Sequence, residues 1–198
     1  IRLYLLLCLC KISCQAASSP NLSCIFQSWL FHNNRSGNDY HGSCTGNHNQ
    51  PNFQKMCGII GSNRPDRILE GLKVIKGRGR DGYGILDNGG VYHSKNLKRL
   101  RKPKGEFVLG HALHSVVGAV KQPFYDKTSF VSNCEIYNWK PLCQKYNITA
   151  GNDSELVFKL LNKFGMKILR ELDGVYAFAY QTKEHVYLAR DLIGVKPL

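Results

Sequence analysis

Apolar and polar residues follow regular periods only from Met56 onward. The apolar run over Cys57–Gly61 predicts a short buried strand. The apolar residues that follow recur three and four positions apart, which predicts an amphipathic helix with Pro65 in its first turn. Ser62 or Asn63 is expected to cap this helix, and Gly77 is expected to end it. Its apolar stripe consists of Ile68, Leu69, Leu72 and Ile75.

Turn residues divide the rest of this region into further strands and helices. Asp87-Asn88-Gly89-Gly90 is typical of a hairpin turn between strands at Tyr83–Leu86 and Val91–His93. Strands followed by helices and then by strands, without a strand–helix–strand rhythm, predict an α+β fold with antiparallel sheets. We expect further strands at 107–115 and 129–133, helices at 139–146, 154–163 and about 166–172, and a final hairpin of 174–181 and 185–190.

The first 55 residues differ in composition from the rest. They open with an early basic residue, a short apolar run and small residues, the layout of a secretory signal, and continue rich in Ser, Asn, His and Gly without a period. The chain begins with Ile1, and its first Met is Met56. We expect read-through from upstream of the true start, with a targeting or pro-segment as the alternative. We therefore divide the chain into a leader over 1–55 and a domain over 57–198.

The chain is basic, with a net charge of +13, of which the leader carries +3 and the rest +10. Such a balance raises the question of nucleic-acid binding. The densest basic run, 95–104, has no interleaved aromatic residues for base stacking, and no zinc-finger, RNP-type or KH-type pattern accompanies it. We expect a solvated loop on a basic protein, and no nucleic-acid partner.

Cysteine usage differs between the two parts. Five of the eight cysteines lie in the leader, and only Cys57, Cys134 and Cys143 follow. So few cysteines in the domain indicate a reduced, cytoplasmic protein without a disulfide framework. The apolar run of the leader is too short to span a bilayer, so no membrane partner is expected.

Cys57 is the first candidate for chemistry. A lone Cys in an apolar strand is most often a small buried hydrophobe. Its position directly after Met56 changes this interpretation, because removal of the Met would leave Cys57 with a free α-amino group. That amine has an ordinary pKa of about 8 and can accept the thiol proton within the same residue. Cys57 is therefore a candidate N-terminal nucleophile.

Several segments spread over 57–198 resemble one family when they are taken in order. They are MCGIIG at 56–61, RGRDGYG at 78–84, SNCEIYN at 132–138, NDSE at 152–155, and LDGVYAFA at 172–179 with ARDLIGVKPL at 189–198. Together they resemble the class II glutamine amidotransferases, which are N-terminal-nucleophile hydrolases. The NxEIYN form is similar to the asparagine synthetase (glutamine-hydrolysing) branch.

The resemblance implies a fold and an activity. It implies a four-layer αββα sandwich of two antiparallel sheets, and hydrolysis of glutamine to glutamate and ammonia. The ammonia would pass to an ATP-dependent synthetase domain in cis that amidates aspartate, and ATP and Mg would belong to that domain. No cofactor or metal is expected in the glutaminase part, and the resemblance is compatible with a homodimer.

The resemblance also implies roles for individual residues. The Asn133 side chain and the backbone N–H of Cys134 would form an oxyanion hole. Asp153, with Glu135, would bind glutamine, and Asp153 would pair with its α-ammonium group. Without the resemblance, Asn133 is a turn residue at a strand end, and Asp153 is a helix N-cap. Both interpretations of Asp153 can hold together.

Two positions depart from the family pattern. Cys134 stands where the family has Gly, which is tolerated if φ is negative and the Cβ points away from substrate. Leu113 stands where the family has the Arg that binds the glutamine α-carboxylate, and Leu cannot form that pair. Arg80 or His114 is expected to replace it, with Arg80 favoured because it stays charged at neutral pH. The alternative is a non-catalytic or regulatory relative that has lost glutamine binding.

Overall fold

The computed structural model describes residues 2–7, 25–27, 56–115 and 120–198. The helices and strands of these residues follow in chain order. They are β1 (Arg2–Leu7), β2 (Ile25–Gln27), β3 (Gly58–Ser62), α1 (Pro65–Ile75), β4 (Gly82–Asp87), β5 (Gly90–Ser94), a 3-10 helix (Leu97–Arg99), β6 (Val108–Leu113), β7 (Phe124–Asp126), β8 (Thr128–Ile136), α2 (Trp139–Tyr146), α3 (Asp153–Phe164), a second 3-10 helix (Gly165–Glu171), β9 (Gly174–Gln181) and β10 (His185–Arg190).

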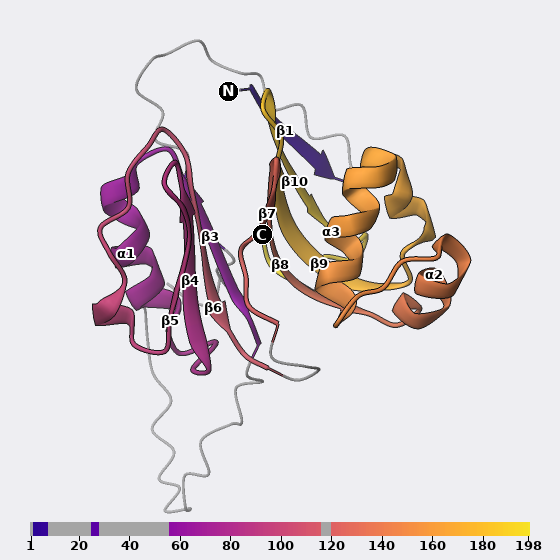
Figure 1. Cartoon of the computed structure of the whole chain (residues 1–198), viewed down its shortest axis with the longest axis horizontal. Helices are drawn as coiled ribbons and strands as arrows, with labels where there is room; N and C mark the ends of the chain where they lie inside the picture. Colours follow the sequence, from indigo (N-terminus) through magenta and orange to yellow (C-terminus); the bar gives the residue numbers. More distant parts are fainter. Residues whose placement is uncertain (1, 8–24, 28–55, 116–119) are drawn as a thin grey trace, which may run out of the picture.

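The strands form two sheets that lie face to face between the helices (Figure 1). One sheet has the order β2-β3-β6-β4-β5 and is covered on its outer face by α1. The other has the order β1-β10-β9-β8-β7 and is covered by α3, with α2 beside it. All neighbouring strands are antiparallel except β1 and β10. The predicted α+β fold and its four-layer αββα order are confirmed.

Most of the predicted elements form close to their expected bounds. The final hairpin and α2 have the predicted residues, and the hairpin of β4 and β5 turns at Asn88-Gly89. The predicted capping of α1 is wrong, because Arg64 is the N-cap and makes no side-chain cap bond. Ser62 Oγ instead accepts a hydrogen bond from the Arg64 N–H at 2.9 Å, one residue before the helix. The helix predicted at about 166–172 is a 3-10 helix.

Two short segments of the leader pair with sheet edges. β1 lies beside β10 in parallel, and β2 pairs with β3 antiparallel. Each leader strand occupies an outermost position of its sheet, since β1 and β2 stand at the ends of the two strand orders. That the leader over 1–55 lies outside the domain over 57–198 stays a prediction.

Each sheet is buried on both faces, which produces three apolar layers. Neighbouring residues on one strand point to opposite faces. On β3, Ile59 therefore faces the other sheet while Ile60 faces α1, and on β8, Val131 faces the other sheet while Phe130 faces α3. The layer between the sheets is made of Ile59, Leu86, Phe107, Leu109, Val131, Ala177, Ala179, Val186 and Leu188. The same alternation directs Cys57 and Asn133 toward this middle layer.

Substitution of Phe130 tests the apolar packing between α3 and its sheet. The Phe130 side chain is fully buried and packs against the rings of Phe124, Phe158 and Phe178. Phe130→Ala should lower the free energy of unfolding by about 3–5 kcal/mol, because it removes buried area and leaves a cavity. Urea unfolding of the variant measures this loss. The control is Val74→Ala on α1, at a position that is 59% exposed. Equal losses in the two variants would contradict the assigned packing.

Candidate active site

Cys57 lies immediately before β3, and its thiol is held by backbone groups at the end of β6. Cys57 Sγ accepts a hydrogen bond from the His114 N–H and donates one to the His114 carbonyl oxygen, each at 3.4 Å. The Cys57 carbonyl accepts a hydrogen bond from Arg78 Nε at 3.3 Å. A side chain at Gly79 would bring its Cβ within 2.5 Å of the Ala112 carbonyl oxygen, so the loop after α1 needs glycine here to approach β6. Arg78 thus holds this loop against Cys57.

The surroundings of Cys57 keep its thiol protonated at neutral pH. Burial raises the pKa of the Cys57 thiol, and the negative charge of Asp153 raises it further. The His114 N–H, Lys196 and Arg78 act in the opposite direction but do not cancel the effect of burial. No acidic or imidazole side chain accepts a hydrogen bond from this thiol in the described part of the chain. Among the described residues, no side chain that could act as a base is hydrogen-bonded to Cys57.

Asn133 offers an unused hydrogen-bond donor between the sheets. It lies on β8 and is only 4% exposed. Its side-chain nitrogen Nδ2 has no hydrogen-bond partner among the described residues. A buried donor without a partner is costly, and it is available to a ligand oxygen. The turn interpretation of Asn133 is not supported, since β8 continues past it to Ile136.

Cys134 directs its side chain away from the middle layer, toward the start of α3. Its Sγ lies 3.2 Å from Ser154 Oγ, 3.6 Å from Ser132 Oγ and 3.8 Å from Asp153 Oδ2. The φ angle of Cys134 is not positive. The φ condition for tolerating Cys at the family's Gly position is therefore met, while the Cys134 side chain points toward Asp153. Burial strongly raises the pKa of the Cys134 thiol, which makes this thiol a poor nucleophile.

Asp153 begins α3 and faces the end of β8. Its Oδ2 accepts a hydrogen bond from the Ile136 N–H at 3.0 Å, and its Oδ1 accepts one from the Ser154 N–H at 2.8 Å. The N-cap of α3 is Asn152, whose side chain accepts from the Glu155 N–H, so the capping role predicted for Asp153 belongs to its neighbour. Burial raises the pKa of Asp153, although hydrogen bonds from these backbone N–H groups lower it.

Glu135 is held by a lysine to which the sequence assigned no role. Lys196 Nζ donates a hydrogen bond to Glu135 Oε1 at 2.7 Å and lies 3.2 Å from Met56 Sδ. Glu135 and Met56 lie 61 and 140 positions from Lys196 in the sequence, so no local pattern predicts these contacts. In the sequence, Lys196 is marked only by its place in the family-like segment 189–198. Lys196 thus links Glu135 on β8 to Met56, the residue that precedes Cys57.

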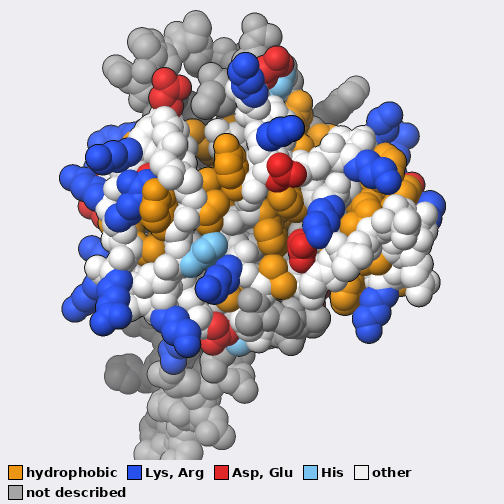
Figure 2. Space-filling view, viewed as in Figure 1, with side chains coloured by type: hydrophobic (Ala, Val, Ile, Leu, Met, Phe, Trp, Pro, Cys, Tyr) orange, Lys and Arg blue, Asp and Glu red, His pale blue; other side chains and the backbone are white. Residues whose placement is uncertain are grey.

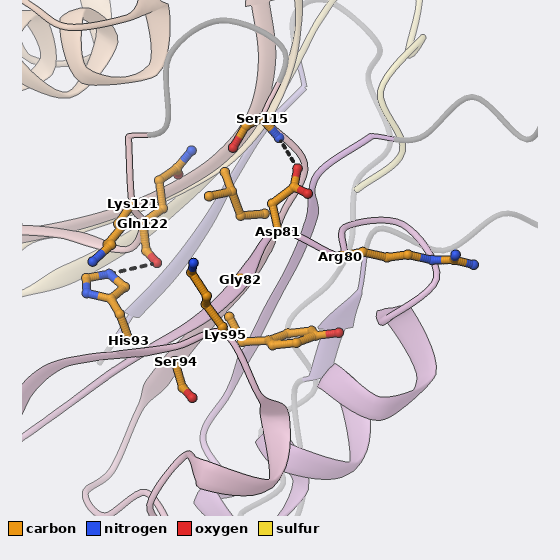
Figure 3. Close-up of a pocket in the computed structure, with 11 residues that line it drawn as sticks. Arg80, Asp81, Gly82, His93, Ser94, Lys95, Ser115, Lys121 and Gln122 are labelled. Carbon is orange, nitrogen blue, oxygen red and sulfur yellow. Dashed lines mark hydrogen bonds between the residues drawn. The ribbon is translucent and has the colours of Figure 1, made fainter.

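Leu113 and Arg80 line a cavity of about 610 Å³, which Figure 3 shows with its lining side chains. Lys95 and Lys121 also line it, which the sequence did not indicate. The Arg80 side chain extends away from the cluster around Gln122 in this view. Cys57, Asn133 and Asp153 do not line the cavity. Its link to Cys57 is Leu113, whose neighbour His114 contacts the thiol.

His114 is engaged with Asp81. Its Nδ1 lies 3.4 Å from Asp81 Oδ2, and the same carboxylate oxygen accepts a hydrogen bond from the Ser115 N–H at 2.7 Å. Asp81 thereby ties the loop after α1 to the end of β6. The imidazole of His114 does not line the cavity beside Leu113.

The basic surface is spread out. Figure 2 shows Lys and Arg side chains on both halves of the visible face, with apolar side chains between them. In the densest basic run, Arg101 pairs with Asp87 and stacks on Tyr92, while Lys98 and Arg99 are exposed. Across the described ranges, no helix is long and apolar enough to cross a membrane. Nor do His, Cys, Asp and Glu gather in threes to hold a metal ion in these ranges.

Comparison with solved structures identifies the class of fold. The chain is similar to the glutamine phosphoribosylpyrophosphate amidotransferase of B. subtilis solved with ADP and GMP, with a TM-score of 0.56 and 21% identity over 67% of this chain and 37% of that one. Two largely antiparallel sheets between helices, with Cys57 directly before the inner strand β3, match the N-terminal-nucleophile hydrolase fold.

Sequence comparison then identifies the family. The model of the glutamine amidotransferase domain matches residues 56–198, and the chain belongs to this family, in its class II. It is 32% identical over 164 residues to a protein of Methanocaldococcus jannaschii provisionally named asparagine synthetase (glutamine-hydrolysing) 2, and 32% identical over 162 residues to asparagine synthetase B (glutamine-hydrolysing) of Escherichia coli. Each alignment covers 72% of this chain but only 31% and 26% of those proteins, so the chain spans less than a third of their length.

The raised pKa of Asp153 predicts a pH-dependent stability. A carboxyl whose pKa is higher in the folded state stabilises the fold below its ordinary value of about 3.9, and this stability is lost as the pH rises through the folded-state pKa. Asp153→Asn removes the titration. The stability of the variant relative to wild type should therefore increase between pH 3 and pH 7.

Urea unfolding at the two pH values measures this difference. Asp126→Asn, at an exposed position on β7, controls for the loss of a surface carboxylate. A relative stability of Asp153→Asn that is the same at pH 3 and pH 7 would contradict the assigned burial of this carboxyl.

Proposed function

We propose that residues 57–198 hydrolyse glutamine to glutamate and ammonia, with Cys57 as an N-terminal nucleophile. The observation that carries this proposal is the setting of the thiol. It contacts backbone groups of His114 and no side-chain base in the described part of the chain, and it directly follows Met56. The base must therefore come from Cys57 itself, as the α-amino group that removal of Met56 would release.

The reaction follows from this arrangement in two stages. The amine accepts the thiol proton, and the thiolate attacks the side-chain amide carbon of glutamine. The oxyanion that forms would receive hydrogen bonds from Asn133 Nδ2 and from the backbone N–H of Cys134. The amine returns its proton to the leaving nitrogen, which departs as ammonia. Water then attacks the thioester with the same amine as base, and glutamate leaves with the thiol restored.

Binding of glutamine is assigned to the charged groups around this centre. Asp153 keeps lone pairs beyond its two backbone hydrogen bonds, and with Glu135 it would receive the α-ammonium group. The α-carboxylate needs a cation or two good donors once it leaves water. Leu113 supplies neither, so Arg80 or His114 is assigned this role. Arg80 remains favoured because it lines the cavity beside Leu113, whereas His114 is engaged with Asp81.

The ammonia is proposed to pass to an ATP-dependent synthetase domain in cis that amidates aspartate. The support comes from the relatives, which are named as glutamine-hydrolysing asparagine synthetases and are more than three times as long as the matched region. ATP and Mg would bind in that domain. A cytoplasmic location and a homodimer remain proposals of the same kind.

The leader provides the first test. An amide nitrogen is not basic, so a chain that keeps residues 1–55 should be inactive as a glutaminase. A chain begun at Met56 should release ammonia from glutamine once the Met is removed, and mass spectrometry should find Cys57 at its N-terminus. Circular dichroism of both chains controls for folding. Glutaminase activity from a chain shown to retain Ile1 would contradict the mechanism.

The carboxylate partner provides the second test. Arg80→Ala should raise KM for glutamine by about 10- to 100-fold, the effect of losing a charged hydrogen bond of about 1.5–3 kcal/mol, and His114→Ala should raise it less. Arg99→Ala, in the exposed part of the first 3-10 helix, is the matched control. Wild-type KM in both variants would exclude the two assignments. A wild-type chain that binds no glutamine would instead favour the non-catalytic relative that Leu113 suggests.

A further inference from the structure

Lys196 is the only lysine or arginine that is buried among the described residues. It is 3% exposed, and its ammonium group has lost most of its water. Burial of a charged ammonium is costly unless partners with good geometry replace its hydration. The position of this charge is therefore set by the groups around it.

The backbone around Lys196 is tied down by one buried carboxylate. Asp191 is 5% exposed and accepts three hydrogen bonds from backbone N–H groups. Its Oδ2 accepts from Lys196 at 3.0 Å and from Tyr176 at 3.3 Å, and its Oδ1 accepts from Val195 at 2.8 Å. These bonds fasten the segment after β10 to β9. The lysine side chain thus extends from a fixed base.

The ammonium group reaches both parts of the proposed catalytic centre. It bonds to Glu135 Oε1 at 2.7 Å, two residues beyond Asn133 on β8. It also lies 3.2 Å from Met56 Sδ, in the residue joined to Cys57. The Glu135 side chain is 57% exposed, so Lys196 is the buried member of the pair. One positive charge thus stands between the strand of the oxyanion donors and the nucleophile.

The other charges near Cys57 differ from Lys196 in what they contact. Asp153 is negative and disfavours the thiolate, and the Cys134 thiol is held protonated by burial. Arg78 is positive and bonds to the Cys57 carbonyl, while the His114 imidazole faces Asp81. Glu135 offsets part of the Lys196 charge because the two are paired. Lys196 is thus one of two cations that counter Asp153.

We propose that Lys196 is a positioning residue for the nucleophile, which keeps a positive charge at the residue joined to Cys57 and fixes the Glu135 carboxylate on β8. The inference rests on the proposed function in treating Cys57 as the nucleophile. A nearby cation stabilises the thiolate relative to the thiol. After removal of Met56 the same charge would also favour the neutral, basic form of the Cys57 amine. Lys196 would thereby aid both halves of the single-residue nucleophile and base.

The test measures the thiol directly in the full chain, where no glutamine turnover is needed. Iodoacetamide reacts with the thiolate, and the tryptic peptide that begins at Met56 contains Cys57 as its only cysteine. Lys196→Met keeps the length and removes the charge. At pH 8 it should slow alkylation of Cys57 by about threefold to tenfold, a Coulomb effect of one unit charge at short range. Lys196→Arg should restore a rate close to that of wild type.

Glu135→Gln separates an electrostatic role from a merely structural one. It breaks the same pair but leaves the positive charge uncompensated, so it should accelerate alkylation where Lys196→Met slows it. Local loosening of the site would instead change both rates in the same direction. Lys183→Met, at an exposed position between β9 and β10, is the control for losing one positive charge elsewhere.

Opposite changes in Lys196→Met and Glu135→Gln, with Lys183→Met like wild type, support the inference. Changes in one direction, or a wild-type rate in Lys196→Met, overturn it. Glutaminase activity is measured separately on the processed wild-type chain. Its absence would contradict the proposed function without altering the comparison of thiol rates.

Discussion

The apolar contact between the two sheets is the constraint on which the candidate site depends. Ile59 and Leu109 from one sheet meet Val131 and Ala177 from the other in a layer of buried side chains. Because residues alternate along a strand, packing these side chains inward also turns Cys57 and Asn133 inward. A shift of one residue in the register of β3 or β8 would direct the thiol or the amide to a helix-covered face. The register of the strands therefore decides which side chains face the candidate site.

Within this frame, two groups of the candidate site lack a side-chain partner among the described residues. The Cys57 thiol has no side-chain base among the described residues, and Asn133 Nδ2 has no acceptor. Burial raises the pKa of Asp153, and a buried Lys196 stands nearby. Such an arrangement destabilises the empty domain and is expected where a ligand completes the contacts. Under the proposed function, the side-chain oxygen of glutamine would accept a hydrogen bond from Asn133 Nδ2, and its α-ammonium group would pair with Asp153.

The sequence predicted those features of the fold and site that depend on neighbouring residues in the chain. The final hairpin and α2 form at their predicted residues because turn residues and apolar periods are local. The caps of α1 and α3 were misassigned by one or two positions, since several adjacent polar residues compete for the same N–H groups. β7, of three residues, is too short to show a period. The role of Lys196 and the lysines of the cavity depend on tertiary contacts that no spacing encodes.

The central claim is that Cys57, and neither of the other two cysteines of the domain, is the nucleophile. The most direct measurement is reaction of the processed chain with a diazo-ketone analogue of glutamine, followed by peptide mapping. Cys57 should carry the adduct, since it alone combines a free amine with the oxyanion donors, while Cys134 is held protonated by burial. An excess of glutamine should protect it. An adduct found mainly on Cys134 or Cys143 would contradict the account.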